Sequence, residues 1–128
     1  MTIVLIAGQG WTERSKKMNK AEYSERSMSM SKYNRKIIMI CGIPHLVSEK
    51  DDIFNSDNTH FGQIDFEKCT ITINANMTDE EQEETLCHEI LHGILVHLGY
   101  DELSQDEKFV QAVSNGINKT FEIKGERE

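Results

Sequence analysis

The sequence has little of several residue types, and each shortage excludes a class of protein. It contains 1 proline and 1 tryptophan in 128 residues, and aromatic residues make up only 7% of it, so aliphatic side chains and methionine must form much of the core. The 3 cysteines include no C-x-x-C pair, which excludes a cysteine zinc ribbon and a thioredoxin-like redox motif. We expect Cys41, Cys69 and Cys87 to be small buried hydrophobic residues in a reducing cytoplasm.

Long apolar runs and an excess of basic residues are also missing. No apolar run approaches the ~20 residues of a membrane span, and Ile3–Ala7 is too short for the core of a signal peptide. The net charge of −8 disfavours nucleic acid as an electrostatic partner. We therefore expect a cytoplasmic protein that binds neither a membrane nor nucleic acid.

The length fits one domain, but the composition changes along it. Residues 1–35 contain a polar and basic stretch, which we interpret as a surface helix or a partly disordered arm. The clearer patterns begin at Lys36, so we expect the folded domain to span residues 36–128.

Four short segments have the pattern of strands. Residues 36–41 are apolar, a turn at Gly42–Pro44 follows, and residues 45–48 can return as a partner strand. Apolar and polar residues alternate in Phe61–Phe66 and again in Cys69–Asn74, which predicts a hairpin with one buried face. These segments predict a small, mostly antiparallel sheet.

Two capping boxes predict two helices after the strands. Thr78 and Glu81 open a helix that should run to Leu98, with Gly99 as its stop. Ser104 and Glu107 should open a second helix that ends near residue 121. Its buried stripe should consist of Phe109, Val110, Val113, Ile117 and Phe121. The fold class is therefore α+β.

The first helix carries the H-E-x-x-H run His88–His92. Two histidines four residues apart lie about 40° apart around a helix, so both rings can reach one zinc ion. Glu89 lies about 100° from His88, where its carboxylate can take a proton from an attacking water. The same run can occur by chance with core histidines, but here it lies inside a helix that is apolar on nearly every side. His97 should point away from the metal.

A zinc site of this kind needs a third protein ligand, and three acids are candidates. Glu107 is our first choice, Asp106 our second and Glu102 our third. In glutamate-liganded zincins such as thermolysin, the third ligand opens a short sequence pattern on the helix that follows the motif helix. Residues 107–111 are similar to that pattern, although Val110 and Gln111 depart from it. These departures leave the hydrogen bond that would support a histidine ligand in doubt.

From about Gly62 to Phe121 the chain resembles the ImmA/IrrE-type metallopeptidases of phages and other mobile elements. The likeness lies in the hairpin, the acidic helix start, the motif helix and the acid-led helix after it. The resemblance implies a minimal zincin-like fold, with the sheet packed on the H-E-x-x-H helix and the following helix. It also implies a zinc metalloendopeptidase with a protein substrate, because some members cleave a helix-turn-helix repressor.

Two other functions stay open at this point. A zinc-stabilised binding module could use the same ligands without turnover, although it has no need of Glu89. Residues 97–101 are similar to part of the motif of zinc-dependent ribosomal-RNA-processing endoribonucleases of the YbeY type. In this chain the spacing from His92 to His97 is one residue short of that motif, and the acidic charge disfavours an RNA substrate.

Overall fold

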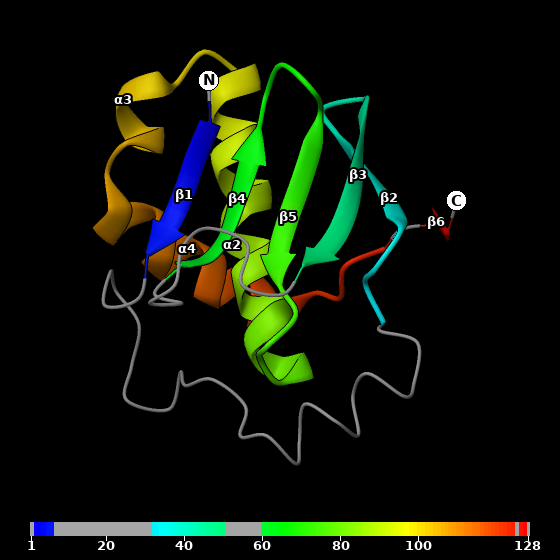
Figure 1. Cartoon of the computed structure of the whole chain (residues 1–128). Coiled ribbons are helices and arrows are strands. Elements are labelled where there is room, and N and C mark those ends of the chain that lie inside the picture. Colours follow the sequence, from blue (N-terminus) through cyan, green and yellow to red (C-terminus); the bar gives the residue numbers. More distant parts are fainter. Residues whose placement is uncertain (1, 7–31, 51–59, 125, 128) are drawn as a thin grey trace.

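The computed structural model describes residues 2–6, 32–50, 60–124 and 126–127, which form one sheet and the helices packed on it (Figure 1). The described strands are β1 Thr2–Ile6, β2 Lys36–Ile40, β3 Ile43–Lys50, β4 His60–Asp65, β5 Thr70–Asn74 and β6 Glu126–Arg127. The described helices are α2 Asp79–His97, α3 Asp101–Ser104 and α4 Glu107–Thr120.

The sheet has the strand order β1-β4-β5-β3-β2-β6. All neighbouring strands are antiparallel except β3 and β5, which are parallel. The predicted α+β class with a mostly antiparallel sheet is therefore confirmed. β1 belongs to the same sheet. Residues 7–31 lie outside the described residues, so the domain boundary expected after residue 35 stays a prediction.

The first hairpin turns earlier than the sequence predicts. Ile40 pairs with Ile43, so the loop consists of Cys41 and Gly42, whose φ angles are 51° and 81°. Two residues with positive φ are typical of the type I′ turn that joins twisted strands. Pro44 lies inside β3, opposite Met39 of β2. The pairing of β3 with β5 begins only at Leu46, so the N–H that proline lacks is not needed by β5.

The helix that carries the motif begins and ends as predicted. The Thr78 side chain accepts from the Glu81 N–H, and the Glu81 carboxylate accepts from the Thr78 N–H, which completes the capping box. At the other end Gly99 has φ +88°, and the Tyr100 N–H donates to the Leu95 carbonyl over 2.8 Å. This Schellman arrangement ends α2 at the glycine because a left-handed residue costs least there.

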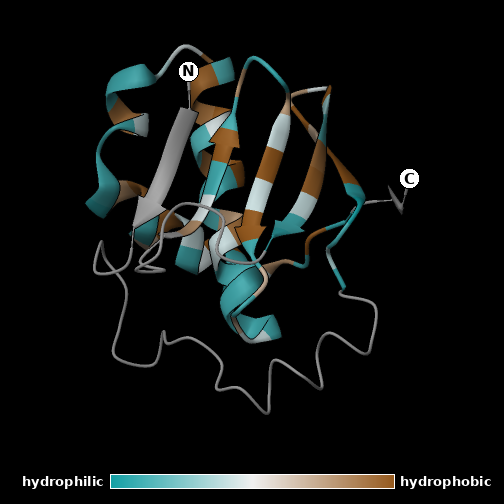
Figure 2. Ribbon diagram, viewed as in Figure 1, coloured by the Kyte–Doolittle hydropathy of each residue, from teal (hydrophilic) through white to brown (hydrophobic). Residues whose placement is uncertain are grey.

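α2 lies between the sheet and α4, and it is buried against both. Its sheet side packs against the core formed by strand residues such as Ile40, Ile64 and Ile71, and its other side packs against Val110 of α4. Figure 2 shows hydrophobic segments along the central strands and α2, with a hydrophilic start to the helix. The motif therefore lies in the interior of the fold.

The second capping box is not formed. Residues 101–104 form the separate short helix α3, and α4 is capped by Asp106, whose Oδ1 accepts from the Phe109 N–H over 3.1 Å. Ser104 is buried as the last residue of α3, so its side chain does not cap α4. Phe121, predicted to be buried, lies just past the end of α4 and is 67% exposed.

The helices of the described residues include none that is both long and apolar enough to cross a membrane.

Two glycine-to-alanine substitutions should have opposite effects on stability. A Cβ at Gly62 would lie 2.7 Å from Thr85 Cγ2 and 3.1 Å from the Thr72 carbonyl oxygen, whereas one at Gly116 in α4 meets nothing within 4 Å. We expect Gly62→Ala to lower the free energy of unfolding by about 1–3 kcal/mol through overpacking. Gly116→Ala should raise it by up to about 1 kcal/mol through helix propensity. Urea unfolding of both variants checks this, and a stabilised Gly62→Ala would contradict the packing.

His45 should make the fold less stable in mild acid. Its ring is fully buried, and burial lowers the pKa of His45 from 6.5. The hydrogen bond with the Ile43 carbonyl opposes this lowering, and the charge of His97 adds to it. Since the unfolded chain takes up the proton more readily, the free energy of unfolding should fall as the pH drops below about 6.5. Urea unfolding at about pH 7.5 and about pH 5.5 should show a larger loss for the wild type than for His45→Phe. Equal losses would contradict this role.

Candidate metal site

Two histidines of α2 project side by side toward α4. The Nε2 atoms of His88 and His92 lie 3.1 Å apart, and their ring centroids lie 4.8 Å apart. The side chains are 0% and 1% exposed. The i, i+4 spacing on one helix face accounts for this approach.

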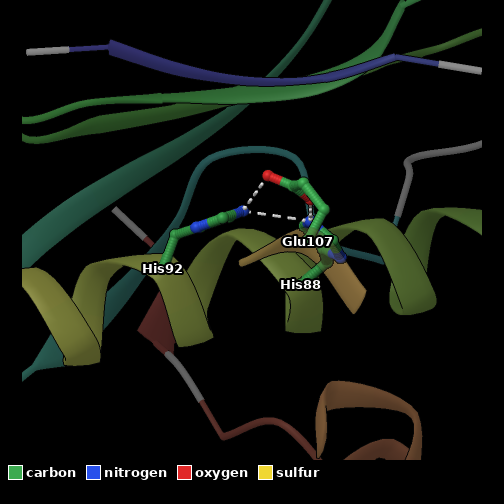
Figure 3. A group of neighbouring side chains, drawn as sticks. All are labelled: His88, His92 and Glu107. Carbon is green, nitrogen blue, oxygen red and sulfur yellow. Dashed lines mark hydrogen bonds and ion pairs between the residues drawn. The ribbon is translucent and has the colours of Figure 1, made fainter. Parts of the chain in front are cut away.

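The third member of the cluster is Glu107, the first residue of α4 (Figure 3). Its Oε2 lies 3.0 Å from His88 Nε2, and its Oε1 lies 3.2 Å from His92 Nε2. Because Asp106 caps the helix, the Glu107 carboxylate is free to reach across to α2. Burial alone would raise the pKa of Glu107, but hydrogen bonds from both rings outweigh burial and lower it to about 2.

Glu89 lies between the two histidines in the sequence and is completely buried. Neither of its carboxyl oxygens has a hydrogen-bond partner among the residues that the structure describes. Burial raises its pKa well above 4.5, and the negative charge of Glu107 adds to that rise. A carboxyl in this state is costly in a core and is typical of a functional site.

The geometry fits a tetrahedral divalent metal ion. The ligand atoms of His88, His92 and Glu107 all lie within 4.8 Å of one another, and their closest pairs are 3.0–3.2 Å apart. Two ligands about 2.0–2.1 Å from a tetrahedral zinc ion would lie about 3.4 Å apart. Two imidazoles and one carboxylate are a common zinc ligand set, and three protein ligands leave a position open for water or substrate.

The other residues considered from the sequence lie elsewhere. Asp106 is occupied as the cap of α4, and Glu102 is exposed on α3. Cys87 is buried beside His88, but its thiol donates to the Ser114 carbonyl. His97 contacts His45 and Phe66 edge-on, away from the cluster. In the described part of the chain, only His88, His92 and Glu107 form a group that could hold a metal.

The hydrogen-bonding support behind the histidines, which the sequence left in doubt, differs between the two rings. His92 Nδ1 lies 3.1 Å from the Ser104 hydroxyl oxygen, whereas His88 Nδ1 has no partner among the described residues. Gln111 donates to Asn115 Oδ1. Sequence reasoning missed Ser104 because a serine three residues before a glutamate also fits a capping box.

A comparison with protein families finds one match. The peptidase family model described as the IrrE N-terminal-like domain matches residues 42–118, which include β3 to β5, α2, α3 and most of α4. No curated protein and no solved structure matches the chain.

Replacing the acid of α4 should abolish tight metal binding. We expect the wild type to retain about one zinc per chain after dialysis, and Glu107→Gln to bind zinc more than about tenfold more weakly, because a neutral amide replaces a charged ligand. Glu102→Gln is the matched control on the exposed face of α3 and should bind zinc as the wild type does. Elemental analysis of the three proteins checks this. Equal zinc in all three would exclude Glu107 as a ligand.

Proposed function

The chain belongs to the IrrE N-terminal-like domain family of peptidases, and we propose that it is a zinc-dependent endopeptidase that hydrolyses a protein substrate. The observation that supports this most is the convergence of His88, His92 and Glu107 next to the buried Glu89, which has no hydrogen-bond partner among the described residues. In this proposal His88, His92 and Glu107 hold the zinc ion. When bound, zinc polarises the peptide carbonyl and increases the acidity of water.

Glu89 is the proposed general base and acid. Its carboxylate takes a proton from the water as the water oxygen bonds to the peptide carbon, and it returns the proton to the amide nitrogen as the C–N bond breaks. Burial and the Glu107 charge both raise the pKa of Glu89, so this carboxyl group holds a proton more firmly than an exposed one does, which suits a group that must accept a proton and return it.

A metal-stabilised binding module is the competing function. Such a module would use the same three ligands, but it gives no reason to bury the Glu89 carboxyl group where no residue in the described part of the chain forms a hydrogen bond to it. The match to a peptidase family also disfavours the endoribonuclease alternative, as does the net charge of −8.

The proposed substrate is a helix-turn-helix repressor of a phage or another mobile element. The family resemblance is the support for this partner. Incubating the zinc-loaded protein with the helix-turn-helix protein encoded nearest to its gene, and mapping the products by mass spectrometry, tests it directly.

Glu89→Gln should separate binding from catalysis. The amide keeps the shape of the side chain but cannot accept the proton, so we expect unchanged zinc content and a loss of hydrolysis of at least about 100-fold. Unfolded fluorescent casein is a suitable probe because its peptide bonds are accessible. Full activity in Glu89→Gln would exclude this residue as the base, and zinc binding without any cleavage by the wild type would favour the binding module.

A further inference from the structure

We propose that Ser104 is a positioning residue that holds the His92 ring in the orientation and protonation form needed for metal binding. This inference rests on the proposed function, because it concerns the same metal. The Ser104 hydroxyl oxygen lies 3.1 Å from His92 Nδ1, and both side chains are 1% exposed. No solvent competes for a contact this deeply buried.

The hydroxyl contacts His92 twice, and together the two contacts fit one donated and one accepted hydrogen bond. The Ser104 hydroxyl donates to the His92 main-chain carbonyl over 3.5 Å, and a hydroxyl has only one proton to donate. Its oxygen is then free to accept from His92 Nδ1–H. In the form that binds a metal, the proton stays on Nδ1 and the neutral ring carries its lone pair on Nε2, which is the atom that faces His88 and Glu107.

The local fold makes Ser104 available for this contact. α3 ends at Ser104, and Asp106 supplies the cap of α4 in its place. Two residues only three positions apart therefore serve the same site: Glu107 is a candidate ligand, and Ser104 supports the candidate ligand His92. Partners of this kind behind a metal-binding histidine orient the ring and strengthen metal binding.

The two imidazoles of the site are held differently. His92 has Ser104 behind it, while His88 Nδ1 has no hydrogen-bond partner among the described residues. If Ser104 only filled space in the core, its loss would affect folding stability and leave metal affinity alone. If it positions His92, its loss must weaken metal binding even in a folded protein.

The test compares Ser104→Ala with Ser104→Thr and with Ser114→Ala. Ser114 is a matched control because it is also 1% exposed and its hydroxyl donates to a main-chain carbonyl, that of Gln111, which is not a candidate ligand. Zinc affinity is measured for each protein by competition with a chelating indicator. Thermal unfolding in the presence of a chelator measures the stability of the metal-free forms.

We expect Ser104→Ala to bind zinc about 10-fold to 100-fold more weakly than the wild type, as is usual when such a supporting partner is lost. Ser104→Thr, which keeps the hydroxyl, should recover most of the affinity, and Ser114→Ala should bind as the wild type does while losing similar thermal stability. Wild-type affinity in Ser104→Ala would overturn the proposal. A threonine variant as weak as the alanine variant would also overturn it, since the hydroxyl would not be what matters.

A measurement on the wild type keeps the test decisive if Ser104→Ala does not fold. A long-range ¹H–¹⁵N NMR spectrum of the zinc-loaded protein should show His92 bound through Nε2, with a slowly exchanging proton on Nδ1. Binding through Nδ1, or a rapidly exchanging Nδ1 proton, would overturn the role of Ser104. These outcomes differ from failure of the proposed function, in which the wild type binds no zinc or binds it without hydrolysing any peptide bond.

Discussion

The packing of α4 against α2 brings a carboxylate into contact with two buried imidazoles, and the chemistry of the fold depends on this contact. A buried polar group without a partner destabilises a fold by about 1–3 kcal/mol, and a buried charge costs more. Glu107 and the rings of His88 and His92 reduce that cost for one another. Glu89, fully buried beside them, gains no hydrogen bond from the described residues. The same interior thus holds an unsatisfied carboxyl next to a converging ligand set, a combination that stability alone does not favour.

The sheet supplies the rigidity that such a cluster requires. α2 approaches the sheet closely at two glycines: a Cβ at Gly62 would meet Thr85, and a Cβ at Gly93 would lie 3.1 Å from the Ile64 side chain. Gly93 directly follows His92, so the helix is packed against the strands at the level of the motif. Rings carried by a helix that is buried on both sides have little freedom to move, and rigid placement of this kind is what a binding or catalytic site needs.

Much of the fold and part of the site could be predicted from the sequence, because the signals involved are local. The capping box at Thr78, the stop at Gly99 and the i, i+4 spacing of the histidines each act within a few residues. For the third member of the cluster the sequence could only rank three acids, with Glu107 first, since the choice depends on how α4 packs on α2. Ser104 was misread for the same reason: a serine and an aspartate two residues apart can each cap a helix, and tertiary contacts decide which one does. The parallel pairing of β3 with β5 leaves no local pattern at all.

X-ray absorption at the zinc edge of the metal-loaded protein tests most directly whether two imidazoles and one carboxylate form the site. The spectrum should fit only nitrogen and oxygen neighbours at about 2.0–2.1 Å, with the outer-shell scattering of two imidazole rings. Cys87 adjoins His88 in the sequence, but its thiol is directed to the Ser114 carbonyl and burial raises its pKa to about 11, so no sulfur is expected. A sulfur neighbour at about 2.3 Å, or fewer than two imidazoles, would contradict the arrangement of α2 and α4 on which the proposed function rests.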